Sequence, residues 1–244
     1  MYDTPEIFNQ AEGIVAVQSK RNFENKEGKI IPFNLGLSTS DDLSLVKHNR
    51  ELFFNSIGIS ESQVASSFQI HGTEILKTSI SCRENGYDAV ICDKPNVFAC
   101  VTVADCVPVL IADPKKKIVA AVHSGWRGTA KEILKKTLHE LQRSYFCETK
   151  NLLVYIGTCI TLNSFEVGEE VASQFNEDVV VRRQGKQFID LKKANKNQLL
   201  SSGLPEANIE TSSKCTFLNN EDYFSFRKEG EKSGRMLAII GFKE

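Results

Sequence analysis

The sequence predicts a single domain of the mixed α/β class (α+β), in which layered mixed β-sheets are flanked by helices. Strand-like apolar runs alternate with amphipathic helical segments along the chain, which is the pattern of a layered domain. The chain has 244 residues, of which 41% are hydrophobic and 25% charged, so it can bury one sizeable core without disulfide staples. Because no linker, low-complexity tract or repeat interrupts the chain, residues 1–244 are expected to form one domain.

The first half of the chain is expected to consist mainly of strands, with one helix. Residues 13–19 (GIVAVQS) predict a strand, and a polar loop rich in turn residues follows it. Residues 38–58 predict a helix that carries His48, because serine and aspartate cap candidates precede apolar residues at helical spacing and Gly58 closes the segment. Four β-rich runs come next, at residues 64–72, 87–93, 97–113 and 116–125.

The second half of the chain is expected to alternate between helices and strands. Residues 129–145 predict an amphipathic helix, with Thr129 and Glu132 in a capping box and His139 on the charged face. Its apolar stripe consists of Ala130, Ile133, Leu134, Leu138 and Leu141. Further helices are predicted at residues 166–175 and 192–203, and further strands at residues 151–157, 178–183, 187–191, 213–217 and 235–242.

Charge and cysteine usage limit the partners and the compartment. Thirty basic and 31 acidic residues leave a net charge of −1, which provides no electrostatic footprint for nucleic acid or for an anionic membrane. The N-terminal residues lack the cationic and apolar parts of a secretory signal, and no apolar run is long enough for a membrane span. Seven cysteines without close spacing are typical of a reducing compartment. We therefore expect a cytoplasmic protein with small-molecule partners, whose oligomeric state the sequence does not indicate.

Two of the four histidines and one cysteine stand at predicted strand ends. His71 and His123 follow β-rich runs in QIHG and VHSG, and Cys106 follows TVAD and precedes Pro108. Each of them alone is more often structural, as a buried thiol or a hydrogen-bonded imidazole. Together they could supply three zinc ligands and leave a fourth position open for water or substrate, as in catalytic zinc sites. Their spacing does not show whether the three meet in space.

The segment HSGWRGTAKE predicts a local anion site. It reads as a strand end, a glycine-rich turn and the start of a helix at Thr129, so the backbone N–H groups of Gly128, Thr129 and Ala130 would be free, with Arg127 beside them. Phosphate binds to such amides and to the planar guanidinium of arginine. The alternative is a tight connection that packs the neighbouring tryptophan into the core and leaves Arg127 on the surface. Both interpretations stay open at this point.

Six segments give the chain a resemblance to a known family. They are QIHG, YDAVICD, VTVADCVPVLIAD, AAVHSGWRGT, IGTCITLNSFEVGEEV and YFSFRKEGEKSGR, and their order covers nearly the whole chain. In these segments the chain resembles the YfiH/DUF152 family, also called the laccase-domain, polyphenol oxidoreductase or peptidoglycan-editing-factor family. The resemblance implies a single YfiH-like α/β domain of sandwiched layers and a metal site formed by His71, Cys106 and His123. It also implies phosphorolysis of adenosine, inosine and methylthioadenosine, and deamination of adenosine.

The resemblance also implies ligands at the N-terminus, where the match is less complete. Arg21 and Asn34 correspond to family residues that would contact phosphate or sugar, but the Gly-Gly turn that usually follows the arginine is missing, and the usual Gly-Pro is Gly157-Thr158. For the deamination, zinc would lower the pKa of a bound water so that it can attack the purine. Asp105, next to Cys106, is the candidate that would move the proton.

Three other functions remain open. In a cysteine hydrolase or amidase, which could edit a peptidoglycan precursor, Cys106 would be the nucleophile and His123 the base; such an enzyme does not need His71. A copper polyphenol oxidase is ranked lower, because four histidines are too few for multicopper chemistry, although copper stays possible as the bound metal. A binding module with a purely structural metal would need a fourth protein ligand, and other cysteines could provide it.

Overall fold

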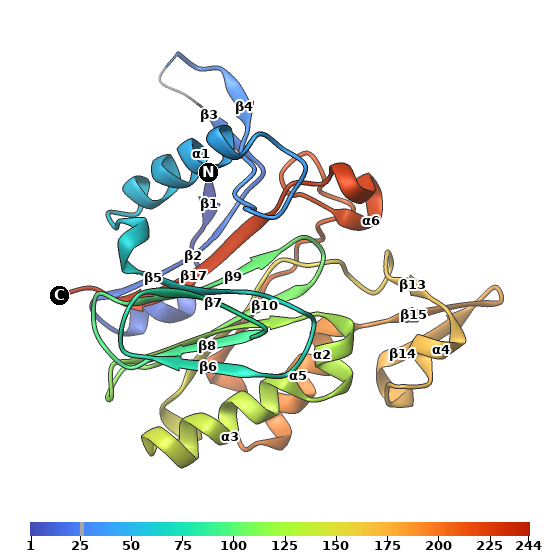
Figure 1. Cartoon of the computed structure of the whole chain (residues 1–244). Helices are drawn as coiled ribbons and strands as arrows, with labels where there is room; N and C mark the ends of the chain where they lie inside the picture. Colours follow the sequence, from blue (N-terminus) through green and yellow to red (C-terminus); the bar gives the residue numbers. More distant parts are fainter. Residues whose placement is uncertain (25–26) are drawn as a thin grey trace.

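The computed structural model describes residues 1–24 and 27–244, and two six-stranded sheets stacked face to face form its centre (Figure 1). Residues 25–26, in the predicted polar loop, lie outside the described part. The first sheet has, in spatial order, β1 (Tyr2–Asp3), β2 (Ile14–Ser19), β17 (Met236–Phe242), β9 (Phe98–Val103), β5 (Val64–Phe68) and β7 (Cys82–Asn85). The second has β16 (Ile209–Thr211), β12 (Leu153–Ile156), β10 (Val107–Asp113), β11 (Ile118–Ser124), β8 (Ala89–Cys92) and β6 (Ile75–Thr78).

Helices cover the two outer faces of this pair of sheets. Helix α1 (Leu43–Ser56) lies on the first sheet, and α2 (Trp126–Ala130), α3 (Ile133–Tyr145) and α5 (Leu191–Ser201) lie on the second (Figure 1). A small sheet of β13 (Glu166–Val167), β15 (Lys186–Ile189) and β14 (Val180–Arg183) projects at one side together with α4 (Glu169–Ala172). The remaining elements are the hairpin of β3 (Asn22–Glu24) and β4 (Ile30–Pro32), and α6 (Phe226–Glu229) near the C-terminus. The mixed α/β fold of layered sheets and flanking helices agrees with the predicted fold class.

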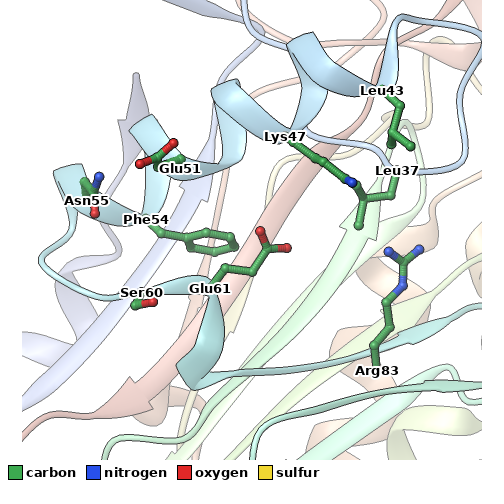
Figure 2. A pocket seen from close by; sticks show the side chains of 9 residues that line it. All are labelled: Leu37, Leu43, Lys47, Glu51, Phe54, Asn55, Ser60, Glu61 and Arg83. Carbon is green, nitrogen blue, oxygen red and sulfur yellow. The ribbon is translucent and has the colours of Figure 1, made fainter.

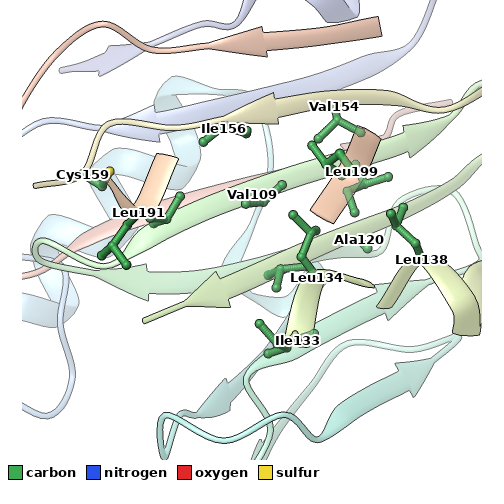
Figure 3. Close-up of a cluster of buried hydrophobic side chains, with 14 of the residues drawn as sticks. Val109, Ala120, Ile133, Leu134, Leu138, Val154, Ile156, Cys159, Leu191 and Leu199 are labelled. Atoms are coloured by element: carbon green, nitrogen blue, oxygen red, sulfur yellow. The ribbon is translucent and has the colours of Figure 1, made fainter. Parts of the chain in front are cut away.

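Three hydrophobic layers hold this stack together. Alternation along β17 shows two of them, because Ala238 and Ile240 face the second sheet whereas Leu237 and Ile239 face α1. The third layer lies between the second sheet and its helices, where Leu134 and its neighbours pack on the strands (Figure 3). The central strands β9, β10, β11 and β17 are therefore buried on both sides, which explains their nearly continuous apolar runs.

The longest β-rich run differs from its prediction. Residues 97–113 form two strands, β9 in the first sheet and β10 in the second, joined by a turn in which Asp105 has a φ of 79°. The composition of the run gives no sign of this change of sheet, because both strands are apolar on both faces. This turn carries Cys106, one of the three predicted metal ligands.

Other segments also depart from the predictions. The predicted helix at 166–175 contains β13 and only the short α4, and residues 213–217 form a single bridge between Cys159 and Cys215 instead of a strand. The predicted helix from Thr129 is divided into α2 and α3, because Glu132 adopts a left-handed backbone (φ 58°) without a capping hydrogen bond. Within the described residues, no helix is long and apolar enough to span a membrane.

Candidate metal centre and active-site cavity

The structure brings His71, Cys106 and His123 together, which their spacing could not show. One ligand atom from each lies within 4.8 Å of the others, and Cys106 Sγ is 3.9 Å from His71 Nε2. The two imidazole rings meet edge to face, with centroids 4.8 Å apart. Among the described residues this is the one cluster of three metal-ligating side chains, and its two imidazoles and one thiol are a donor set that zinc prefers.

Two turns and a strand end position these three side chains. His123 is the second-last residue of β11, His71 lies in the turn after β5, and Cys106 lies between β9 and β10. His71 and Asp105 have φ values of 60° and 79°, in a backbone region that residues other than glycine rarely occupy. Such strain persists where the surroundings hold it in place, and it is concentrated at functional sites.

Asp88 is the residue that fixes both histidines, and our sequence analysis did not find it. Its Oδ1 lies 2.7 Å from His123 Nδ1 and accepts the backbone N–H of His71 at 2.9 Å, while its Oδ2 accepts those of Gly72 and Ile70. Burial alone would raise the pKa of this carboxyl, but the hydrogen bond and charge of His123, together with the backbone N–H groups of Gly72 and Ile70, hold the pKa below its ordinary value. A carboxylate on Nδ1 leaves Nε2 of His123 free as a ligand. The sequence signal was an acidic residue directly before the buried strand β8.

Gly125 keeps the space beside the three side chains open. A Cβ at this position would lie 3.0 Å from His71 Cδ2, 3.1 Å from Cys106 Sγ and 3.5 Å from His123 Cε1. Any side chain would therefore press on His71 and Cys106 and touch His123. The absence of a side chain leaves room for an ion and a fourth ligand, so the geometry fits a metal centre.

The electrostatics of the cluster favour a charged pair. Burial raises the pKa of the Cys106 thiol, but the facing His123 and His71 lower it to about 6. Burial lowers the pKa of His123, whereas Cys106 and Asp88 raise it to about 9. The thiolate is thus the form present at neutral pH, and it is the form that binds a metal or attacks a carbonyl.

A cavity of about 590 Å³ opens from this cluster. Its floor is the outer face of the first sheet, and its walls include the aromatic rings of Phe68, Trp126, Phe165 and Phe226. A second cavity of about 720 Å³ lies beside helix α1 and shares Leu37 and Arg83 with the first (Figure 2). Both cavities are in the size range of small-molecule sites, and the first is the candidate substrate site because His71, Cys106 and His123 line it.

The predicted anion site is built differently from the expectation. Arg127 lines the cavity, with its guanidinium 4.3 Å from the ring centre of Trp126, but Gly128 and Thr129 are buried away from the cavity. Helix α2 begins at Trp126, so the Thr129 amide is not free and donates to the carbonyl of Gly125 at 2.8 Å. The prediction of a helix start with free amides at Thr129 is therefore wrong.

Arg21 and Asn34 do not line the cavity. Arg21 forms an ion pair with Glu229 at 3.1 Å and stacks on Phe224. Asn34 is buried, and its Oδ1 accepts the backbone N–H groups of Gly36 and Arg235. Both residues thus have partners within the protein.

Asp105 lines the cavity next to Cys106, and both of its carboxylate oxygens are engaged. Oδ1 accepts the hydroxyl of Thr216 at 2.5 Å, and Oδ2 accepts the backbone N–H of Arg227 at 2.6 Å. These bonds tie two C-terminal segments to the turn that presents the thiol.

The chain is similar to known proteins over most of its length. The family model described as multi-copper polyphenol oxidoreductase laccase matches residues 15–243. A purine nucleoside phosphorylase from Bacteroides thetaiotaomicron is 34% identical over 88% of this chain and 86% of its own length, and the adenosine deaminase RL5 from an unknown prokaryotic organism is 30% identical over 94% of each. The crystal structure of the hypothetical protein YfiH from Bacillus licheniformis superposes with a TM-score of 0.88 at 26% identity, covering 97% of this chain and 94% of that one.

Proposed function

The chain belongs to the multi-copper polyphenol oxidoreductase laccase family, and we propose that it is a zinc-dependent purine nucleoside phosphorylase that also deaminates adenosine. Its substrates would be adenosine, inosine and methylthioadenosine, with inorganic phosphate. Relatives similar over most of its length are named as a phosphorylase and as a deaminase. The observation that carries the proposal is the three-ligand cluster with an open side, at a cavity of nucleoside size.

His71, Cys106 and His123 would hold the zinc. When bound, the ion would act as a Lewis acid and lower the pKa of a water, which is the chemistry that deamination requires. The remaining histidines, His48 and His139, are exposed on α1 and α3, so they cannot complete a multicopper centre with this cluster. We therefore prefer zinc to copper, in spite of the family's name.

The chain's own residues have separate roles in this proposal. Arg127 would hold phosphate in the cavity while the base leaves, since phosphorolysis depends on positioning the anion and stabilising charge. Gly128 and Thr129 would hold helix α2, which carries Arg127, and Arg21 would brace the loop around Glu229. Asp105 would hold the Cys106 turn, and each of its carboxylate oxygens keeps a second lone pair with which it could accept a proton.

A cytoplasmic location and small-molecule partners complete the proposal. All seven cysteines are free, as is usual in a reducing compartment. The net charge of −1 gives no general attraction to nucleic acid or to an anionic membrane.

The decisive experiment is an incubation of the zinc-loaded protein with adenosine, with and without phosphate. Chromatography then resolves adenine, inosine and hypoxanthine. We expect adenine only with phosphate, and inosine under both conditions. If neither product forms although zinc is bound, the proposal fails.

One observation favours a second candidate, a cysteine hydrolase or amidase that could act on a peptidoglycan precursor. Asp88, His123 and Cys106 stand in the order orienter, base and nucleophile, and the thiol is already a thiolate at neutral pH. This triad does not use His71. His71→Ala should therefore leave a hydrolase active, whereas it should abolish metal binding and the nucleoside chemistry.

A further inference from the structure

Five arginines line the cavity, and they differ in how their charge is compensated. Arg50 is buried and forms an ion pair with Glu61 at 2.6 Å. Three others are exposed residues, namely Arg83, Arg127 and Arg227. Arg235 is half-buried, and it forms no ion pair with any carboxylate of the described residues. Cys106, Asp105, Glu229 and Glu231 act on it electrostatically, but none of the three carboxylates forms a direct ion pair with it. Because a cation partly withdrawn from water is stabilised by a directly paired anion, this position suits an anion from outside the protein.

The side chain of Arg235 is held in a fixed orientation. Nη1 donates to the carbonyls of Ser233 at 2.6 Å and Gly234 at 3.0 Å, and the guanidinium lies 5.4 Å from the ring centre of Phe226. Its aliphatic part packs so closely on Gly36 that a Cβ there would lie 2.6 Å from Arg235 Cγ. Among the described residues, nothing accepts a hydrogen bond from Nε or Nη2. These two parallel donors are the pair with which arginine binds phosphate.

Asn34 holds the backbone of this arginine. Its Oδ1 accepts the N–H of Arg235 at 2.8 Å, and the neighbouring Leu35 N–H donates to the carbonyl of Arg235 at 3.0 Å. The amide group of Asn34 is fixed in turn, because it donates to Thr39 at 2.8 Å and to Asp41 at 2.7 Å. Asn34 therefore acts on the cavity through Arg235 and needs no contact with a ligand.

The sheet places Arg235 beside the candidate metal centre. In the antiparallel pair of β17 and β9, Met236 is opposite Val103. One further step in this register sets Arg235 opposite Ala104, two residues before Cys106 in the chain. Ala104, Cys106 and Arg235 all line the same cavity. An anion on the free edge of Arg235 would thus share the cavity with whatever His71, Cys106 and His123 bind.

From this geometry we propose that Arg235 is the principal ligand of the phosphate co-substrate, and that Asn34 is its positioning residue. The inference rests on the proposed phosphorolysis only for the identity of the anion. In this proposal the exposed Arg127 is a second, weaker contact of the phosphate. It also explains how Asn34 can serve phosphate binding without lining the cavity.

The test is direct binding of inorganic phosphate, measured by titration calorimetry without nucleoside and at constant ionic strength. Arg235→Gln should weaken binding at least about tenfold, because a charge-assisted hydrogen-bond pair is lost. Arg83→Gln is the matched control, since it removes an exposed arginine of the same cavity, and it should change the affinity less than about threefold. Zinc content and the thermal midpoint are measured for every variant. If Arg235→Gln does not fold, Arg235→Lys replaces it and should still weaken binding, because lysine keeps the charge but loses the planar fork.

Asn34 is tested by coupling. Asn34→Ala should weaken phosphate binding, and adding it to Arg235→Gln should weaken it no further, because both changes remove one interaction. Asn34→Asp keeps an acceptor for the Arg235 amide and should restore part of the affinity.

Several results would overturn the inference. The first is an unchanged phosphate affinity in Arg235→Gln, or in Arg235→Lys if that variant is used instead. The second is a larger loss of phosphate affinity in Arg21→Gln than in the Arg235 variant. The third is a double variant of Asn34 and Arg235 in which the two losses of affinity simply add. Failure of the proposed function looks different, because phosphate would still bind through Arg235 while no nucleoside is cleaved.

Discussion

Adding a single methyl group at Gly125 should weaken metal binding and leave the fold intact. Its backbone (φ −65°, ψ 165°) suits alanine, so Gly125→Ala brings no backbone strain. The new Cβ would press on His71 and Cys106 at 3.0–3.1 Å, and we expect the bound zinc to fall well below one equivalent. Metal analysis of the purified variant measures this. Gly72→Ala is the control, since its Cβ would meet nothing nearer than 3.4 Å, and equal zinc loss in both variants would contradict the prediction.

Asp88 should set the affinity of the site without touching the metal. Asp88→Asn removes the negative charge behind His123 and leaves one backbone N–H facing an amide, so zinc affinity should fall roughly 10- to 100-fold. Competition with a chromophoric chelator measures the change. Asp113→Asn is the control, because Asp113 is equally buried at the far end of β10, where it accepts the amides of Lys115 and Lys116. A comparable loss of zinc affinity in the control would show that the effect is general destabilisation.

Some residues of the site could be predicted from the sequence and others could not. His71, Cys106 and His123 were predictable because rare polar side chains interrupt apolar runs at strand ends. Asp88 and Gly125 were not, since their roles follow from the pairing of β8 with β11 and from the fold of the turn after β11. The link between Asn34 and Arg235 joins residues 201 positions apart, and no local pattern encodes it.

At the scale of elements, periodicity predicted most of the long strands and helices and missed changes of direction. The stripe of the predicted helix at 129–145 is correct from Ile133 onward, yet the division at Glu132 depends on tertiary packing. Likewise, β9 and β10 were predicted as one run, because strands buried on both faces lack an alternation that would mark the boundary. The second error falls at the site itself, because residues 104–106 between β9 and β10 line its cavity.

Strand β1 should contribute a pH-dependent part of the stability. Asp3 accepts hydrogen bonds from Lys214, at 2.8 Å, and from the hydroxyl of Tyr223. Burial alone would raise the pKa of Asp3, but these bonds hold it below its ordinary value of 3.8. Because the folded-state pKa is the lower one, the stabilisation is present above pH 3.8 and is lost as the pH falls through the lowered pKa.

Asp3→Asn should therefore reduce the free energy of unfolding by roughly 1 kcal/mol at pH 7, and the difference from the original protein should disappear in acid. Urea unfolding at a series of pH values measures this. Parallel stability curves for the two proteins would mean that the Asp3 carboxylate does not contribute as described.

At the scale of the whole molecule, the metal cluster lies at the ends of strands and not in the middle of the sheets. His71 and Cys106 lie in turns, and His123 is the second-last residue of β11, while the hydrophobic layers hold the sheets and helices together along their length. We therefore expect chelation to abolish nucleoside turnover and to lower the melting temperature, while the protein stays folded at 25 °C. Far-UV circular dichroism with and without chelator measures this. Unfolding on metal removal would favour the structural-metal alternative.

The pairing of β17 between β2 and β9 has a consequence for how the chain acquires this structure. Ile239 of β17 pairs with Val17 of β2, so the centre of the first sheet cannot close until residue 239 has left the ribosome. Until then β2 and β9 present open edges, which are templates for association with other chains. Contacts so distant in sequence also slow the search for the native state. Loss of only the final strand should consequently yield an aggregating product, although every residue of the metal cluster would still be present.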